Sequence, residues 1–498
     1  MTMARVLRLH PEDNVGIALT DLVPGEEGAS EAVPRGHKFA LRLIREGEFV
    51  RKYGQIIGTA TMDIPIGAHV HVQNLGMGED RGGDAGQSGM PTITPAAQQD
   101  SFLGFPRADG RAGTRNFIGI LTTVNCSGSV AQFIAEDAER RGLLNDLPNV
   151  DGIVPIAHGT GCGMADRGEG YDILLRTLAG YAQHPNFGAI LVVGLGCEVM
   201  QLPVLQSAPQ LKDPAHFRFL TIQNQGGTRA TIDAARPVLR ELAETANQVK
   251  RVPIPASKLV IGLQCGGSDG LSGITANPAL GVASDMVVAQ GGTTILSETS
   301  EIYGAEHLLT RRAAPEVAEA LMARIRWWED YTARFGGHMN NNPSPGNKKG
   351  GLTTILEKSL GAVAKGGSAP LSAVYRYGEP VRTSGFVFMD SPGYDPCSVT
   401  GQIASGANLI VFTTGRGSVS GYRPVPCIKL ASNNDLWSRM GDDMDINCGD
   451  IIDGTSLQDK GAEIYAAILE VASGKPTKSE AQGFGRVEFV PWQIGATM

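Results

Sequence analysis

The hydrophobic pattern changes character along the chain. Over residues 4–76, short apolar runs alternate with Gly and Pro turns, as in "ARVLRLH", "VGIALTDL", "KFALRLI" and "HVHVQNL". Runs of this length between turn residues predict a small all-β domain spanning residues 1–76. Residues 77–100 lack hydrophobic periodicity and are rich in Gly, Asp, Gln and Pro, which predicts a flexible linker.

From residue 101 onward, continuous apolar runs alternate with helical stretches, a pattern typical of α/β layering with buried parallel strands. The stretch "KRVPIPASK" near residue 250 predicts a boundary between two α/β lobes, 101–250 and 251–498. The expected fold class is therefore α/β, with a small N-terminal all-β domain followed by two α/β lobes with largely parallel sheets. Strands are predicted over 117–124, 152–157, 189–194, 218–223, 259–263, 292–297, 385–390 and 408–413, and helices over 129–142 and 228–249.

Composition and charge narrow the function classes. The 498 residues carry a net charge of −8 without a long basic run, which argues against a nucleic-acid partner. We find no stretch of 18 apolar residues and no signal-peptide core, so we expect a cytoplasmic protein without membrane contact. Seven cysteines without regular spacing predict reduced thiols rather than disulfides.

Histidines gather in the N-terminal domain. In "GAHVHVQNLG", His69 and His71 stand two residues apart, so on a strand both side chains lie on one face. His37, in "VPRGHKFA", belongs to the same domain. Three imidazoles can bind Fe²⁺ or Mn²⁺ and leave positions open for substrate, or they can divide between metal binding and acid–base work. The alternative is that His69 and His71 are exposed strand residues, and we favour His37 and His71 as the functional pair.

Four cysteines share a second pattern, because each lies within five residues of the carboxyl end of a predicted strand. These are Cys126, Cys162, Cys197 and Cys265. Ligands of open parallel sheets bind at that edge, although cysteine also packs there as a small apolar residue. His158 lies four residues before Cys162 and is a candidate catalytic residue. No C-x-x-C motif occurs, so a zinc ribbon or a ferredoxin-type cluster is not predicted, and a cluster gathered from separate loops stays open.

Two Gly-rich loops carry cations suited to an anionic ligand. "NPSPGNKKGG" presents Lys348 and Lys349 beside free backbone N–H groups and can clamp carboxylates or phosphates, or it is a solvated surface loop. In "FTTGRGS", Arg416 can hold a carboxylate in bidentate fashion. Neither "GTGCG" nor "GLGCE" completes a dinucleotide-binding motif, so NAD is not predicted.

Together these segments resemble the altronate/galactarate dehydratase family of sugar-acid hydro-lyases. The resemblance is carried by "GFPRADGRAGTRN", "HGTGCG", "QCGGSDGLSGITANPALG", "SETSEIYGAEHLLTRRA", "NPSPGNKKGGLTTILEKSLGAVAKGG" and "MDSPGYDPCSVTGQIASGANLIVFTTGRGS". Residues 1–76 resemble the family's N-terminal SAF domain, a small β-clip module.

The resemblance implies dehydration of a sugar acid such as altronate or galactarate to a 2-keto-3-deoxy acid. It also implies a divalent metal, with Fe²⁺ expected and Mn²⁺ or Mg²⁺ as alternatives, and a homo-oligomer, expected to be a dimer. Other functions left open are an iron–sulfur hydro-lyase, a sulfo-lyase acting on sulfolactate and a non-catalytic sugar-acid binding protein. The expected catalytic residues are His37, His71, His158 and Lys348; the expected metal ligands are His37, His69 and His71; and the expected substrate ligands are Arg416, Lys349, Ser268, Asp269, Asn347 and Thr414.

Overall fold

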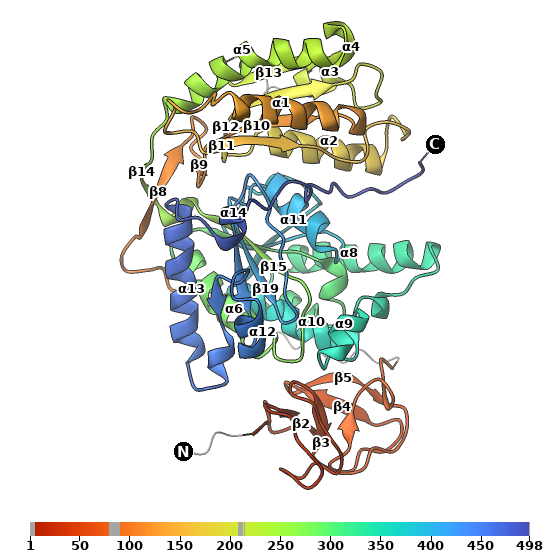
Figure 1. Cartoon of the computed structure of the whole chain (residues 1–498). Coiled ribbons are helices and arrows are strands. Elements are labelled where there is room, and N and C mark those ends of the chain that lie inside the picture. The colour runs from red at the N-terminus through yellow and green to blue at the C-terminus, as the bar shows by residue number, and fades with distance from the viewer. Residues whose placement is uncertain (1–4, 79–89, 208–212, 214, 498) are drawn as a thin grey trace.

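The computed structural model describes residues 5–78, 90–207, 213 and 215–497. Figure 1 shows three bodies in a row, with the N-terminal β domain at one end, a large α/β body in the middle and a smaller α/β body at the other end. A small antiparallel sheet lies where the chain passes between the two α/β bodies. It is formed by β14 (Val252–Pro255), β8 (Ser101–Pro106) and β9 (Ala112–Gly113).

The N-terminal domain consists of two small antiparallel sheets, which confirms the all-β prediction. Its strands are short because Gly and Pro turns interrupt the apolar runs, and its buried residues form a small cluster of their own around Phe39 and also pack against the large body. The first sheet contains β1 (Val6–Leu7), β2 (Val15–Ala18), β3 (Lys38–Ala40) and β6 (His69–Val70), and the second contains β4 (Phe49–Lys52), β5 (Gln55–Ala60) and β7 (Leu75–Gly76).

The smaller α/β body is built on a four-stranded parallel sheet. Its order is β11 (Gly152–Ile156), β10 (Phe117–Thr122), β12 (Phe187–Gly194) and β13 (Phe217–Thr221). Helices α1 (Gly128–Arg140) and α5 (Thr228–Asn247) cover one face, and α2 (Glu169–Ala182) covers the other. Because both faces are covered, the two central strands, β10 and β12, are buried along their whole length. Two short helices, α3 (Leu202–Ser207) and α4 (Ile222–Gln225), complete this body.

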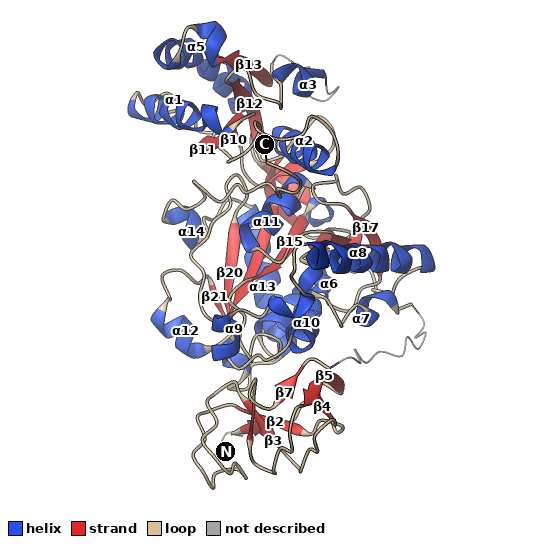
Figure 2. Ribbon diagram, turned by 90° about the vertical axis from the view of Figure 1, so that its right-hand side faces the viewer, coloured by secondary structure: helices blue, strands red, loops and turns tan. Residues whose placement is uncertain are grey.

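The large body contains a seven-stranded parallel sheet, which Figure 2 shows near face-on between its helices. The order is β17 (Leu371–Tyr375), β18 (Gly385–Met389), β16 (Thr293–Leu296), β15 (Val260–Cys265), β19 (Leu409–Thr414), β20 (Cys427–Ala431) and β21 (Ile446–Asn447). Its helices are α6 (Ala276–Ala289), α7 (His307–Thr310), α8 (Pro315–Arg334), α9 (Pro345–Lys349), α10 (Ile355–Val363), α11 (Asp395–Ala404), α12 (Asn434–Arg439), α13 (Leu457–Ala472) and α14 (Lys478–Ala481).

The strand order places a topological switch point in this sheet. The chain starts at β15, builds outward to β16 and β18, and then crosses back to lay β19 on the other side of β15. Ligands of such sheets bind at the carboxyl ends of the strands that flank this point. The fold therefore directs attention to the loops after β15 and β19.

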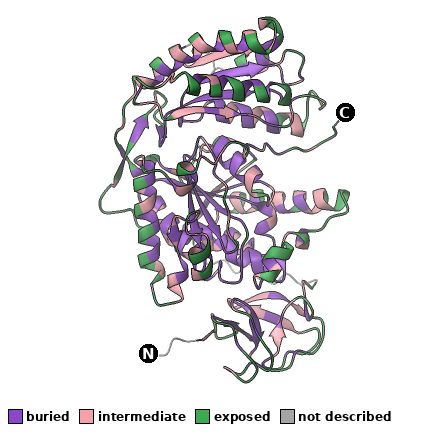
Figure 3. Cartoon of the chain, viewed as in Figure 1, coloured by how far each residue is buried: buried purple, intermediate pink, exposed green. Residues whose placement is uncertain are grey.

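All eight strands predicted in the α/β region are present, and their bounds differ from the prediction by at most two residues. The sequence pattern missed the small antiparallel sheet of β8, β9 and β14, and it missed β17, β20 and β21 of the large sheet. β20 illustrates why, because its "CIKLA" contains a lysine that is fully buried. Figure 3 shows the central strands of both α/β bodies as buried and the outer helix faces as largely exposed. Every helix in the described part of the chain is too short or too polar to cross a membrane.

Candidate active site

Strand register brings three histidines together in the N-terminal domain. β3 pairs with β6 in antiparallel fashion, with Lys38 opposite Val70 and Phe39 opposite His69. The same register places His37 opposite His71, and His69 lies on the diagonal of this pair, so all three side chains share one face. The sequence predicted the shared face of His69 and His71, and the pairing adds His37.

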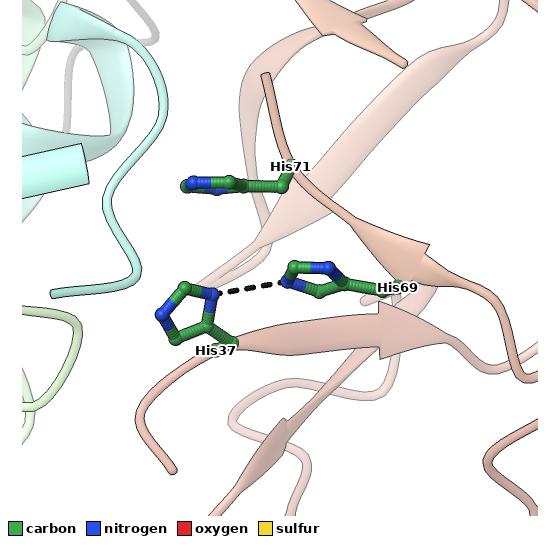
Figure 4. A group of neighbouring side chains, drawn as sticks. All are labelled: His37, His69 and His71. Carbon is green, nitrogen blue, oxygen red and sulfur yellow. Dashed lines mark hydrogen bonds between the residues drawn. The ribbon is translucent and has the colours of Figure 1, made fainter. Parts of the chain in front are cut away.

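The three imidazoles converge on one point (Figure 4). Their ring centroids are 5.0 to 5.3 Å apart, and His37 Nδ1 lies 3.0 Å from His69 Nε2. One ligand nitrogen from each ring lies within 4.8 Å of the others. His71 Nδ1 is buried and has no hydrogen-bond partner among the described residues. A buried, unpaired nitrogen beside two further imidazoles fits a divalent metal ion.

The environment keeps these rings neutral, as metal binding requires. Burial, with the neighbouring Lys38 cation and the other rings, lowers the pKa of His69 and of His71 to about 4. Burial also lowers the pKa of His37. His37 Nε2 lies 3.2 Å from the Lys349 carbonyl oxygen, to which it can donate a proton while Nδ1 faces the other rings. A backbone carbonyl oxygen that accepts from the second ring nitrogen in this way is a usual outer partner of a histidine metal ligand.

The N-terminal domain docks on the carboxyl edge of the seven-stranded sheet through very close backbone approach. A Cβ atom on Gly270 would lie 2.0 Å from the Gly36 carbonyl oxygen, and one on Gly351 would lie 2.5 Å from it. Only glycine fits at these positions, where the loops after β15 and α9 meet the turn that precedes His37. The histidines thus face the switch point of the sheet.

Buried charges hold this docking in place. Lys38 and Lys52 of the N-terminal domain place their ammonium groups 2.9 and 3.0 Å from the two carboxylate oxygens of Glu357 on α10. All three side chains are 1% exposed. Burial alone would raise the pKa of Glu357, but the two ammonium groups lower it to about 2. Lys38 directly follows His37, so the same ion pairs fix the position of the histidine group.

Three cations lie on the loops around this junction without internal partners. Lys348 and Lys349 end α9, and Arg416 lies in the loop after β19, where its backbone N–H donates to the Gly267 carbonyl oxygen at 2.8 Å. Within the described chain, their side chains form neither a hydrogen bond nor an ion pair. Lys349 and Arg416 are exposed and Lys348 is half-buried. Their side chains are therefore available to an anionic ligand, and binding of one by these residues stays a prediction.

The other predicted substrate ligands are engaged within the loops themselves. Asp269 accepts a hydrogen bond from the Asn433 amide at 3.0 Å, Asn347 donates to the Ser268 carbonyl oxygen at 2.8 Å, and the Thr414 hydroxyl accepts from a backbone N–H. These bonds hold the loops after β15, α9 and β19 against one another. Direct substrate contact by Ser268, Asp269, Asn347 and Thr414 stays a prediction.

A second group of functional side chains lies deeper at the same sheet edge, and we call it the acid–base cluster. Lys365 Nζ lies 2.7 Å from Cys265 Sγ and 3.5 Å from a Glu298 carboxylate oxygen. Lys358 Nζ lies 2.7 Å from Glu301. The cluster comprises Cys265, Glu298, Glu301, Lys358 and Lys365, all buried. Its thiol and two carboxylates offer ligand atoms within 4.8 Å of one another, so it is a second group able to hold a metal.

Proton affinities in this region are strongly perturbed. Burial and the Glu301 charge raise the pKa of Glu298 well above its usual value and that of Asp395 to about 7. Burial raises the pKa of the Cys265 thiol to about 12. Glu298 also holds a left-handed backbone conformation, with φ of +69°, that is unfavourable for its residue type. Perturbed carboxyls and backbone strain commonly occur together at catalytic sites.

One helix connects the two groups. On α10, Glu357 binds the lysines of the N-terminal domain and the next residue, Lys358, binds Glu301 of the acid–base cluster. The arrangement combines a candidate metal site, free cations and carboxyls with raised proton affinity at a single sheet edge. These parts match the elimination of a group next to a carboxylate.

Comparison with known proteins agrees with this arrangement. Family models for the altronate/galactarate dehydratase SAF domain, the D-galactarate dehydratase/altronate hydrolase second domain and the D-galactarate/altronate dehydratase C-terminal domain match residues 4–78, 104–247 and 256–497. Altronate dehydratase of Bacillus subtilis is 36% identical over the full length of both chains. The chain belongs to the altronate/galactarate dehydratase family. Galactarate dehydratase (L-threo-forming) of Escherichia coli is 37% identical over 94% of this chain and 93% of that protein.

A further relative carries a different name. The (2R)-sulfolactate sulfo-lyase subunit beta of Chromohalobacter salexigens is 32% identical over 78% of this chain and 96% of that protein. The predicted family and the SAF domain at the N-terminus are both confirmed by these matches. The relatives that match nearly the full chain are both named as sugar-acid dehydratases.

The remaining predicted residues lie elsewhere in this family member. His158 follows β11 of the four-stranded sheet, where its ring nitrogens lie 3.2 Å from the Thr122 carbonyl oxygen and 3.3 Å from the Thr160 backbone nitrogen. The thiols of Cys126, Cys162 and Cys197 lie on loops of the same body. Figure 1 places that body on the far side of the large body from the N-terminal domain, which contains the three histidines. Only Cys265, of the four predicted cysteines, belongs to the edge facing the N-terminal domain.

Sequence reasoning missed most of the acid–base cluster. Glu298 comes directly after the predicted strand 292–297, and Asp395 follows the predicted strand 385–390 by five residues. The rule that singled out cysteines at strand ends therefore also points to these carboxyls. Lys365 carries no such signal, because it reaches the cluster from the turn that ends α10.

Proposed function

We propose that this protein removes water from a sugar acid such as altronate or galactarate and forms a 2-keto-3-deoxy acid. In this reaction the proton at C2 passes to a base, the hydroxyl at C3 leaves as water, and the resulting enol becomes the ketone. The observation that carries the proposal is the three-histidine group facing free cations at the switch point of the large sheet. The dehydratase names of its full-length relatives support the same reaction class, that of hydro-lyases.

His37, His69 and His71 would hold a divalent metal, with Fe²⁺ favoured and Mn²⁺ or Mg²⁺ as alternatives. Three neutral imidazoles suit a first-row metal and leave positions for substrate oxygens. The metal would supply Lewis acidity, which stabilises negative charge next to the substrate carboxylate. The Lys349 carbonyl oxygen, 3.2 Å from His37 Nε2, keeps that ring oriented.

Lys348, Lys349 and Arg416 would bind the carboxylate groups of the substrate. Their side chains are uncommitted and come from two loops that meet at the docking junction. A planar guanidinium pairs with a carboxylate in bidentate fashion, so Arg416 would set its orientation. Lys348 stands closer to the buried side and would neutralise charge that develops during proton removal.

Asp395 would be the base that takes the C2 proton. Its pKa of about 7 is close to the operating pH, where a base is most effective. A Cβ atom on Gly266 would lie 2.0 Å from Asp395 Oδ2, so the carboxyl stands directly beside the loop after β15. Burial, together with the negative charge of Glu301 in the acid–base cluster, raises the pKa of this carboxyl.

The first test concerns substrate and metal together. Anaerobic protein supplied with Fe²⁺ is expected to form a 2-keto acid from at least one member of a panel of aldonates and aldarates, measured by keto-acid derivatisation. A chelator should abolish turnover, and Fe²⁺ or Mn²⁺ should restore it. Full activity of a metal-free preparation would contradict the proposal.

The second test replaces the proposed base. Asp395→Asn keeps the shape of the side chain, and we expect kcat to fall by about 10²- to 10⁴-fold. Because a base must be deprotonated, wild-type kcat should rise with pH through about 7, and the variant should lose this limb. Measurement of kcat as a function of pH for both proteins tests this expectation. Asp233→Asn, at an exposed residue that pairs with Arg236 in the four-stranded body, is the matched control and should keep the wild-type profile.

A sulfo-lyase reaction is a second candidate, and the sulfolactate sulfo-lyase relative favours it. The same removal of a proton next to a carboxylate can expel sulfite from the neighbouring carbon. Incubation with sulfolactate and measurement of released sulfite distinguishes the two reactions. Sulfite release without any keto acid from aldonates or aldarates would replace the dehydratase proposal.

The sequence also suggests the localisation, oligomeric state and domain boundaries of the protein. We propose a cytoplasmic homodimer that acts on a small-molecule sugar acid, without nucleic acid or membrane partners. The proposed domain boundaries are 1–76, 77–100, 101–250 and 251–498, of which residues 79–89 in the linker lie outside the described part. Size-exclusion chromatography with light scattering tests the dimer directly.

A further inference from the structure

Three cysteines at one edge of the four-stranded sheet differ from all others in the chain. Cys126, Cys162 and Cys197 are exposed free thiols, whereas the other four cysteines are buried. Free cysteine is among the most buried residue types in proteins, and an exposed thiol is prone to oxidation. Three exposed thiols on neighbouring loops therefore indicate a site rather than packing.

The loops that carry these thiols interlock. β11, β10 and β12 are adjacent parallel strands, and each thiol follows the carboxyl end of one of them. The Asn125 backbone N–H donates to the Thr160 carbonyl oxygen at 2.9 Å, and the Val199 backbone N–H donates to the Gly161 carbonyl oxygen at 3.0 Å. Cys126 and Cys162 are thus one residue from these bonds, and Cys197 is two residues away.

The loop that follows β11 and carries Cys162 is packed tightly against its neighbours. A Cβ atom on Gly161 would lie 2.1 Å from the Thr123 carbonyl oxygen, so the loop is packed directly on the end of β10. On the other side, the buried Glu198 carboxylate accepts hydrogen bonds from the Thr123 hydroxyl and the Gly196 backbone N–H, both at 2.6 Å. These contacts hold the three thiols at one sheet edge before any ligand binds.

A hydrogen-bond donor faces one of the three thiols. The Gln223 amide donates a hydrogen bond to Cys197 Sγ at 3.6 Å. Hydrogen bonds to the ligand sulfurs are a usual feature of iron–sulfur sites.

We propose that Cys126, Cys162 and Cys197 hold an iron–sulfur cluster that has one iron without a protein ligand. In a mononuclear thiolate site, metal–sulfur bonds of about 2.3 Å bring the sulfurs within about 4 Å of one another. Among the described residues, only the histidine group and the Cys265 group have three ligand atoms within 4.8 Å, so these three thiols are more widely spread. A multi-iron cluster can bind thiolates that are further apart than those of a mononuclear site, because each thiolate binds a different iron. Cys265 lies in the other sheet and is not a ligand.

This site is independent of the proposed reaction at the histidines. We would incubate the reduced protein anaerobically with iron salts and sodium sulfide, remove the excess, and measure bound iron, acid-labile sulfide and absorbance near about 400 nm. Wild type should retain iron and sulfide in about equal amounts with the brown absorbance. Cys162→Ser should lose most of both, while its circular dichroism spectrum stays that of wild type because the side chain is exposed.

Two variants separate this site from the other candidates. Cys265→Ser and His71→Ala should both retain sulfide and absorbance, because neither residue is a ligand of the cluster. Failure of wild type to retain sulfide would overturn the proposal. Retention of sulfide and absorbance by the Cys126→Ser, Cys162→Ser, Cys197→Ser triple variant, or their loss in Cys265→Ser, would overturn it as well.

Discussion

His71→Ala is expected to lower kcat by at least about 10³-fold and to leave the thermal unfolding midpoint almost unchanged. A Lewis acid at a developing enolate is worth several kcal/mol, and about 4 kcal/mol corresponds to that factor. His71 Nδ1 has no hydrogen-bond partner within the described chain, so its removal breaks no internal bond. Steady-state turnover with added Fe²⁺ and a thermal melt measure the two quantities.

The matched control for this variant is His216→Ala. His216 lies in the four-stranded body, where its partly exposed side chain pairs with Asp213, so kcat should stay within a factor of about two. Metal binding gives a second measurement, because His71→Ala should bind Mn²⁺ far more weakly than wild type. Wild-type kcat in His71→Ala would show that this histidine group does not carry the reaction.

Glu357→Ala is expected to cost about 3–5 kcal/mol of unfolding free energy, the largest stability effect of any single change considered. The substitution leaves the ammonium groups of Lys38 and Lys52 buried and unpaired. Activity should fall with stability, because the same lysines fix the N-terminal domain on the large body. Denaturant unfolding measured by circular dichroism gives the free energy.

Glu48→Ala is the control for this prediction, since Glu48 pairs with the exposed Arg42 and its loss should cost less than about 1 kcal/mol. The pH dependence offers an independent check. Because the pKa of Glu357 is lowered to about 2 in the folded protein, its stabilisation is complete above about pH 5 and is lost as the pH falls toward 2. A variant without Glu357 should lack this part of the acid sensitivity, and equal stability of Glu357→Ala and wild type would contradict the ion-pair argument.

The hydrophobic pattern predicted most of the fold because each buried strand is a continuous apolar run in the sequence. Continuous apolar runs such as "AILVVG" have only one stable environment, a sheet covered on both faces. β20 was missed because its buried Lys429 interrupts the apolar run. The Lys429 ammonium group donates to the carbonyl oxygen of Ser420 in the preceding loop, a contact that the hydrophobic pattern does not reveal. The confirmed fold class therefore rests on the regular parts of the chain, whereas the family was identified from the Gly-rich loop motifs between them.

The candidate site was predictable only where local geometry decides it. Two-residue spacing placed His69 and His71 on one face, but the contact with His37 depends on strand register, which the pattern does not contain. The strand-end rule placed the cysteines correctly at carboxyl edges, but it did not tell which of two sheets each belongs to. Cys265 and Lys365 are a hundred residues apart, and only the tertiary fold brings them to 2.7 Å.

Anomalous diffraction at the manganese edge, from crystals grown with Mn²⁺ and a sugar acid that the enzyme dehydrates, tests the central claim most directly. Two groups of described residues can hold the ion, the three histidines and the Cys265 group with Glu298 and Glu301. We predict a manganese peak among His37, His69 and His71, with the sugar acid extending toward Lys348 and Arg416. A peak at the Cys265 group with none among the histidines would contradict it.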